Sequence, residues 1–93
     1  MDIGTATGHP LYSVIDKFGD AEVLGIDIDR SYVPACQKLF KDHKNVTIKE
    51  LNFYDVETEY PDKNFDMIIF GSSFMLMPDQ VKALEIAKRT FTC

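Results

Sequence analysis

Residues 1–11, MDIGTATGHPL, contain a glycine-punctuated loop that begins after only three residues. Gly4 and Gly8 permit positive φ angles and let the backbone approach a ligand closely. A loop of this kind follows a β-strand and leads into a helix, whose first N–H groups attract an anionic group. Taken alone, the stretch is equally typical of a tight strand-to-helix turn without a ligand, so its role depends on the rest of the chain.

The hydrophobic residues recur alternately with helical and strand-like periods along the chain. We expect helices at 9–18, 31–43 and 79–91 and strands at 21–27, 46–51 and 65–70. This alternation favours an α/β protein in which a mainly parallel sheet lies between two helical layers. The chain has no internal repeat or linker, so we expect a single domain over residues 1–93.

Particular residues predict the ends and faces of these elements. Ser31 is expected to cap the second helix, since serine at this position accepts a hydrogen bond from the first turn. The last helix is expected to turn Val81, Leu84, Ala87 and Phe91 toward the core, because they recur at helical spacing.

The charges on the strands predict which strands lie at an edge of the sheet. Lys49 and Glu50 in the strand at 46–51 are typical of an edge strand, which charge protects against further pairing. The strand at 65–70, FDMIIF, has no such protection beyond its second residue, so it is expected to have neighbours on both sides.

Composition excludes several classes of function. The formal net charge is −5, which disfavours binding to a phosphate backbone. No run of 18 apolar residues predicts a membrane span, and no signal peptide is evident at the start. Cys36 and Cys93 lack metal-ligand spacing, so no metal site is predicted. Unpatterned thiols indicate a reducing, cytoplasmic location, with Cys36 packed in the core.

The expected strand ends carry the candidate ligand residues, because ligands of parallel sheets bind at the carboxyl ends of strands. The first loop lacks the GxGxxG and GxxxxGK patterns. Asp27 ends the second strand at the distance expected for a ribose contact, about 20 residues beyond the glycines. Asp29 or Ser31 is the better candidate for capping the next helix. Asp55 follows the third strand and is either a ligand for a nucleobase amine or a solvated loop residue.

Together, DIGTATG, GIDID, the aspartate of NFYDVE and the strand FDMIIF resemble, in order and spacing, the class I S-adenosylmethionine-dependent methyltransferases. The resemblance covers nearly the whole chain. It implies a Rossmann-like three-layer fold with about four strands in the order 3-2-1-4 and three to four helices. It also implies S-adenosyl-L-methionine as the cofactor and methyl transfer as the activity.

The resemblance assigns the cofactor-binding residues. In the first loop it implies that the methionine part of the cofactor contacts Asp2, Gly4, Thr5, Ala6 and Gly8. Asp27 would hold the ribose hydroxyls beside Ile28. Asp55 would take the adenine amine, with the backbone N–H of Val56 toward the ring. Gly71 and Ser72 would flank the transferring methyl group.

The chain departs from the family pattern in two ways. Ala6 replaces a glycine, and its methyl group fits if φ stays negative at that position. The family sheet also has a longer first strand and further strands beyond the fourth helix. We therefore expect a partial domain: a fragment of a longer protein, a truncated reading frame, or a chain completed by self-association or a partner at the edge of the fourth strand.

The sequence leaves the acceptor and the catalytic residues unknown. We expect a small-molecule or protein acceptor. Its pocket is lined by Ser72, Ser73, Phe74, Met75 and Met77, or the stretch Phe74–Met77 belongs to the core at the start of the last helix. His9 is either a base or a structural or solvated residue. Two other functions stay open: a non-catalytic methyltransferase-like scaffold or partner-binding subunit, and a different nucleotide-binding α/β protein such as an NAD-dependent enzyme.

Overall fold

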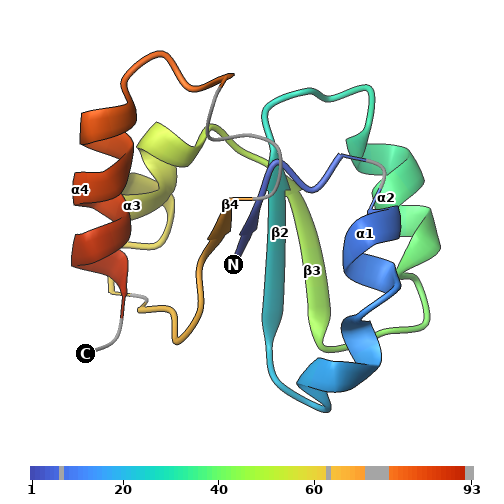
Figure 1. Cartoon of the computed structure of the whole chain (residues 1–93). Coiled ribbons are helices and arrows are strands. Elements are labelled where there is room, and N and C mark those ends of the chain that lie inside the picture. The colour runs from blue at the N-terminus through green and yellow to red at the C-terminus, as the bar shows by residue number, and fades with distance from the viewer. Residues whose placement is uncertain (7, 63, 71–75, 92–93) are drawn as a thin grey trace.

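The computed structural model describes residues 1–6, 8–62, 64–70 and 76–91. Four parallel strands form one sheet in the order β3-β2-β1-β4, as the resemblance implied (Figure 1). The strands are β1 (Asp2–Ile3), β2 (Val23–Asp27), β3 (Val46–Glu50) and β4 (Ile69–Phe70). β3 lies at one edge, which confirms the prediction drawn from its charges.

Helices cover both faces of this sheet, giving the expected three layers (Figure 1). One layer contains α1 (His9–Tyr12), the 3₁₀ helix η1 (Ile15–Phe18) and α2 (Val33–Leu39). The other contains the 3₁₀ helix η2 (Phe53–Asp55), α3 (Val56–Glu59) and α4 (Gln80–Thr90). Over the described residues, no helix combines the length and the hydrophobicity needed to span a bilayer.

β1 is short but lies in the middle of the sheet. Asp2 is in register with Gly25 of β2 on one side and with Ile69 of β4 on the other. The amino group of Met1 donates to the carbonyl oxygen of Met67 at 2.7 Å, and the N–H of Ile69 donates to the carbonyl oxygen of Met1 at 2.8 Å. Three residues therefore suffice to join the two halves of the sheet.

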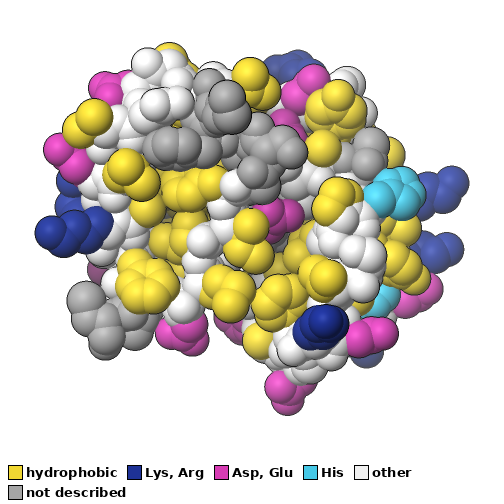
Figure 2. Space-filling view, in the orientation of Figure 1, with side chains coloured by type: hydrophobic (Ala, Val, Ile, Leu, Met, Phe, Trp, Pro, Cys, Tyr) yellow, Lys and Arg dark blue, Asp and Glu magenta, His cyan; other side chains and the backbone are white. Residues whose placement is uncertain are grey.

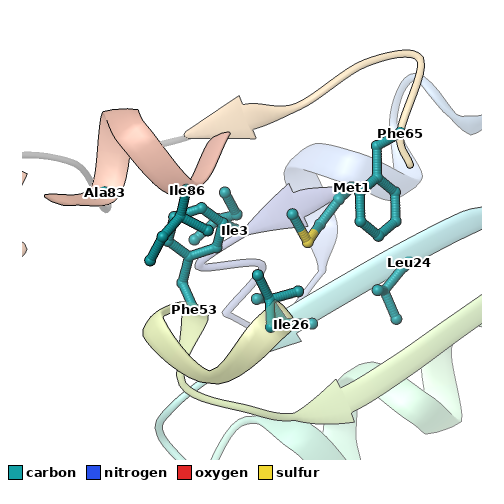
Figure 3. Packing of buried hydrophobic residues seen from close by; sticks show 9 residues of the cluster. Met1, Ile3, Leu24, Ile26, Phe53, Phe65, Ala83 and Ile86 are labelled. Atoms are coloured by element: carbon teal, nitrogen blue, oxygen red, sulfur yellow. The ribbon is translucent and has the colours of Figure 1, made fainter. Parts of the chain in front are cut away.

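The two faces of the sheet carry separate hydrophobic clusters. The cluster under α3 and α4 consists of Met1, Ile3, Leu24, Ile26, Phe53, Val56, Phe65, Ala83 and Ile86 (Figure 3). The cluster under α1 and α2 consists of Leu11, Ile15, Val33, Cys36, Phe40 and Ile48. Cys36 is completely buried, as expected from its helical face. Burial is also the main reason that the pKa of its thiol is raised.

The helix expected at 9–18 is broken into two short pieces. α1 ends at Tyr12, and the N–H of Val14 donates to Leu11 three residues back, which is a 3₁₀ rather than an α-helical bond. The hydroxyl of Ser13 donates to the carbonyl oxygen of Pro10 at 2.7 Å. Such side-chain bonds compete with regular helix, so the apolar period predicted the buried face but not the continuity.

The helix expected at 31–43 is shorter at both ends, and Ser31 does not cap it. α2 begins at Val33, and Tyr32 precedes it without a side-chain cap. The backbone N–H and the hydroxyl of Ser31 both donate to the carboxylate of Asp29 instead. Asp29 stabilises the turn before the helix, so neither residue performs the predicted capping role.

The inward face of α4 was predicted correctly for Ala87, which packs against the core, but wrongly for Val81, Leu84 and Phe91. Ala83, Ile86 and Thr90 are buried, whereas Val81 and Leu84 are 69% and 56% exposed. Thr90 can be buried because its hydroxyl donates to the carbonyl oxygen of Ile86 at 2.9 Å. The helix carries apolar residues on two adjacent stripes, and periodicity alone did not distinguish the stripe that meets the core.

Two further differences concern the segment from 52 to 70. The sequence did not predict η2 or α3 there. Of the strand expected at 65–70, only Ile69 and Phe70 form β4, while Phe65 forms an isolated parallel bridge with Phe91. β4 is the last strand on its side of the sheet among the described residues, as the order 3-2-1-4 implied, so the second neighbour that its apolar sequence favours is not among them.

Gly8 illustrates how tightly the first loop packs against α2, and it generates a prediction. Its φ is +87°, and a Cβ atom there would lie 2.6 Å from Sγ of Cys36 and 2.9 Å from Cε2 of Phe40. We expect Gly8→Ala to lower the free energy of unfolding by about 2–4 kcal/mol, through backbone strain and overpacking together. Urea denaturation followed by circular dichroism measures this loss.

Gly19→Ala tests backbone strain without a collision, because Gly19 also has a positive φ, of +57°, but a Cβ atom there meets nothing within 4 Å. Its ψ of −125° differs from the −2° of Gly8, so the two backbones are not equally strained. A loss in Gly8→Ala of no more than about 1 kcal/mol, the strain of a left-handed alanine alone, would show that the contact with Cys36 is unimportant.

Candidate cofactor site

The loop after β1 turns through three residues with positive φ. Gly4 has φ +76°, Ala6 +51° and Gly8 +87°. The condition that φ stay negative at Ala6 is therefore not met. An alanine in the left-handed region costs about 1–2 kcal/mol, so other interactions must stabilise this loop.

The carboxylate of Asp27 supplies such interactions. The N–H of Ala6 donates to its Oδ2 at 2.8 Å, and the N–H of Asp29 donates to its Oδ1 at 2.9 Å. Asp27 ends β2 and is only 9% exposed. Hydrogen bonds to a carboxylate are stronger than those between neutral groups, so this side chain can hold the β1 loop against the β2 loop.

Asp29 stabilises the second loop in the same manner. Its Oδ1 accepts the N–H of Ser31 at 2.9 Å and the hydroxyl of Ser31 at 2.6 Å. These bonds, the hydroxyl first, lower the pKa of Asp29. The end of β2 and the loop after it therefore carry two hydrogen-bonded carboxylates, Asp27 and Asp29.

A cavity of about 460 Å³ opens at the carboxyl ends of β1, β2 and β3. It is lined by Ile3, Gly4, Ala6, Ile26, Asp27, Ile28, Asp29, Tyr32, Leu51, Asn52, Phe53, Tyr54, Leu76, Met77 and Pro78. Most of the wall is apolar, with Asp27, Asp29 and Asn52 as the polar exceptions. A concave apolar pocket with a few fixed polar groups is the usual form of a site for a small organic ligand.

The structure brings four of the predicted residues to this cavity. Gly4, Ala6, Asp27 and Ile28 line it directly. Three others lie in the first loop and β1 but do not line it. Asp2 is half-buried, Thr5 is buried with its hydroxyl 3.9 Å from Sγ of Cys36, and Gly8 is buried against α2. These three support the loop from behind.

Asp55 and Val56 lie outside the lining of the cavity. Asp55 is exposed, and the side chain of Val56 is 1% exposed in the core. The backbone N–H of Val56, predicted to point toward the adenine ring, donates to the carbonyl oxygen of Phe53. In this arrangement the bond to Phe53 already uses that donor. Gly71 and Ser72 fall outside the described residues.

Sequence reasoning missed most of the wall. The residues that follow β3 and those that precede α4 complete the lining: Leu51, Asn52, Phe53 and Tyr54 from the first group and Leu76, Met77 and Pro78 from the second. Of these, Met77 was considered from the sequence as a residue of an acceptor pocket or of the core, and it both lines this cavity and packs against the core. The sequence contained one signal for the part of the wall that follows β3, because asparagine, present at position 52, is a favourable residue for capping the N-terminus of a helix. Its Oδ1 accepts the N–H of Tyr54 at 3.0 Å and begins η2.

A larger cavity, of about 740 Å³, opens at the opposite ends of the strands. Its lining includes Val23, Leu24, Phe65 and Met67. None of the loops that directly follow the strands contributes a residue to this lining. Size alone would favour it. We place the ligand site at the smaller cavity because parallel sheets bind ligands where the carboxyl ends of strands meet.

Residues 1–92 match the family model described as a methyltransferase domain. The chain therefore belongs to this methyltransferase domain family, in agreement with the resemblance of its motifs. A search of curated proteins gave no significant match.

Two solved structures share the fold over 98% of this chain, each with a TM-score of 0.83. They are the plantazolicin methyltransferases BpumL, 20% identical, and BamL, 21% identical, each in complex with a triazolic desmethylPZN analog and SAH. The chain spans about a third of their length, since the match covers 33% of each. At this identity, the likeness establishes the Rossmann-like methyltransferase fold and nothing finer.

The half-buried carboxyl of Asp2 generates a prediction about pH. Burial is the main cause that raises its pKa above the ordinary 3.8, although a hydrogen bond from Thr5 opposes this. The folded state then holds the proton more tightly, so stability falls as pH rises from 3.8 toward the raised pKa. We expect Asp2→Asn to remove this loss, so its stability relative to the parent improves through that window. Urea unfolding between about pH 3 and pH 7 measures the difference.

Asp29→Asn is the control with the opposite sign. The lowered pKa of Asp29 gives stability that is present above the unfolded pKa and lost as pH falls through the folded one. This variant should lose stability relative to the parent at neutral pH and match it in acid. If Asp2→Asn also lost stability at neutral pH, burial would not be the dominant influence on Asp2.

Proposed function

We propose that the chain is the cofactor-binding part of an S-adenosylmethionine-dependent methyltransferase, acting on a small-molecule or protein acceptor. The observation that carries this proposal is the apolar cavity at the carboxyl ends of the strands, with the carboxylate of Asp27 in its wall. Membership of the methyltransferase domain family supports it.

The residues of the cavity fit the cofactor chemically. Each carboxylate oxygen of Asp27 accepts one backbone N–H, and a carboxylate oxygen has two lone-pair directions. One acceptor site on each oxygen is thus left for the two hydroxyls of a ribose. Ile28, Leu51 and Phe53 offer apolar surface suited to the flat adenine ring.

The proposed contacts differ in their support. Gly4, Ala6, Asp27 and Ile28 line the cavity, so we propose that they contact the cofactor. Asp2, Thr5 and Gly8 shape the loop, and any direct contact from them stays a prediction. The roles of Asp55, Val56, Gly71 and Ser72 also stay predictions, which rest on the resemblance alone.

Bound S-adenosylmethionine supplies a sulfonium-linked methyl group: the S–CH₃ bond breaks as a bond from methyl to the acceptor nucleophile forms, leaving S-adenosylhomocysteine. The protein binds and orients the reactants and excludes water. Such positioning supplies much of the acceleration in an in-line displacement. No described side chain is assigned as an acid or a base.

The chain spans only part of the length of the solved methyltransferases, so we propose a single partial domain that contributes the cofactor site. BpumL and BamL are each in complex with SAH and a triazolic desmethylPZN analog in their crystal structures. These ligands do not identify the acceptor used here. The cytoplasmic location indicated by the cysteines also stays a prediction.

Isothermal titration calorimetry with S-adenosylhomocysteine, S-adenosylmethionine and NAD tests the proposed function. We expect the S-adenosyl compounds to bind and NAD not to bind. Asp27→Ala should weaken S-adenosylhomocysteine binding by about 10–100-fold, because it removes charged acceptors of ribose hydroxyls and loosens the loop. A preference for NAD would replace the proposal with the dinucleotide alternative.

Asp55→Ala is informative in the same titration. Its side chain is exposed and lies outside the cavity lining, so the cavity predicts an unchanged affinity. A loss of affinity comparable to that of Asp27→Ala would instead support the contact implied by the family resemblance. Circular dichroism of each variant separates loss of binding from loss of fold.

A second function is favoured by a different observation, the surface beside β4. Met67 and Phe91 are 54% and 45% exposed, and Leu84 on α4 is exposed too. Hydrophobic side chains gather between α4 and β4 on this face (Figure 2). An exposed apolar surface beside a terminal strand is typical of a strand-pairing site. We propose that this edge, called here the β4 edge, pairs with another chain or a second copy.

We expect Leu84→Lys to reduce self-association through the β4 edge, because charge beside a strand edge opposes pairing. Sedimentation velocity over a range of concentrations measures the effect. Val14→Lys is the control, since Val14 is partly exposed in the other helical layer. A parent chain that stays monomeric throughout, or an equal effect of both variants, would contradict pairing of two copies at this edge.

A further inference from the structure

Tyr54 joins two segments that are distant in the sequence and meet at the cofactor cavity. Its hydroxyl donates to the carbonyl oxygen of Asp79 at 2.8 Å and accepts the N–H of the same residue at 2.9 Å. One side chain thus satisfies both backbone groups of one residue 25 positions away. Two loops can lie close together without such a reciprocal pair of hydrogen bonds. The pair is therefore a specific link between the two segments.

Both partners of this pair are themselves held in place. The N–H of Tyr54 donates to Oδ1 of Asn52, which fixes the start of η2. The side chain of Asp79 accepts the N–H of Lys82 at 3.0 Å and caps α4. Nζ of Lys82 lies 5.6 Å from the centre of the Tyr54 ring, within the range of a cation–π interaction. The reciprocal pair therefore connects two rigid helix ends.

The segment immediately before Asp79 forms one wall of the cavity. Leu76, Met77 and Pro78 line it opposite the loops that follow β1 and β2, and Tyr54 lines it as well. Leu76 is 85% exposed, so little packing fixes its position, whereas Met77 packs against the core cluster under α3 and α4. Among the described residues, the link from Tyr54 to Asp79 is the polar connection between this wall and the segment after β3.

We propose that Tyr54 is a positioning residue whose hydroxyl holds Leu76–Pro78 as a wall of the cofactor cavity. This inference rests on the proposed function, because it concerns the affinity of the same cavity. Since a positioned wall favours the bound ligand, the bound ligand must favour the Tyr54–Asp79 link by the same factor. The link and the cavity are thus coupled energetically.

The test is Tyr54→Phe, which keeps the ring and removes the hydroxyl. We expect the dissociation constant for S-adenosylhomocysteine to rise about three- to tenfold, the range given by losing one or two neutral hydrogen bonds. Hydrogen exchange supplies the second readout. The amide of Asp79 should exchange faster in the variant, and S-adenosylhomocysteine should slow its exchange in the parent but much less in Tyr54→Phe.

Two control variants isolate the backbone link. Asp79→Asn retains a capping oxygen and the same backbone groups, so it should bind S-adenosylhomocysteine like the parent. Tyr12→Phe removes a tyrosine hydroxyl on α1, away from the cavity, and should also bind like the parent. Affinities are compared on folded protein, with thermal melting measured separately.

The outcomes separate this inference from the proposed function. Equal dissociation constants for the parent and Tyr54→Phe, even with a lowered melting temperature, would make Tyr54 a structural residue only and overturn the inference. Protection of the Asp79 amide that does not respond to ligand would overturn it too. A parent that binds no S-adenosyl compound would overturn the proposed function and this inference with it.

Discussion

The carboxylate of Asp27 is the constraint on which the cofactor site depends. It ends the longest central strand and receives one N–H from the loop after β1 and one from the loop after β2. These two bonds hold Ala6 in a left-handed conformation that an alanine would otherwise avoid. The walls of the cavity follow from this arrangement, because both loops are positioned by the same charged group. A single acidic residue thus organises the backbone and offers its outer lone pairs to a ligand.

Much of the fold was predictable because the order of the motifs resembles that of a known family, which implied the strand order 3-2-1-4. The charges on β3 separately indicated an edge strand, and the structure places it at an edge. The boundaries were less predictable, since they depend on side-chain hydrogen bonds. Ser13 interrupts the first helix through Pro10, and Ser31 binds Asp29 instead of capping α2. Periodicity does not encode these competing bonds.

Only one side of the candidate cofactor site was predicted from the sequence. The loops after β1 and β2 carry glycines and aspartates whose order and spacing resemble those of the methyltransferase family. The opposite wall, from Leu51–Tyr54 and Leu76–Pro78, is formed by residues whose types also suit an ordinary core. Their role arises only when η2 and α4 meet through Tyr54 and Asp79. That meeting depends on tertiary packing, as does the choice of Ala83 and Ile86 over Val81 and Leu84 for the buried face of α4.

The central position of β1 has a consequence for how the chain acquires its structure. Asp2 pairs with Gly25 and with Ile69, so β1 completes its hydrogen bonding only when the segment near residue 69 has joined the sheet. Contacts of such high sequence separation slow folding, because a long loop must be closed before they form. Pairing of β1 with β4 is therefore the slow closure in this sheet, whereas β1 and β2, about 20 residues apart, can pair early.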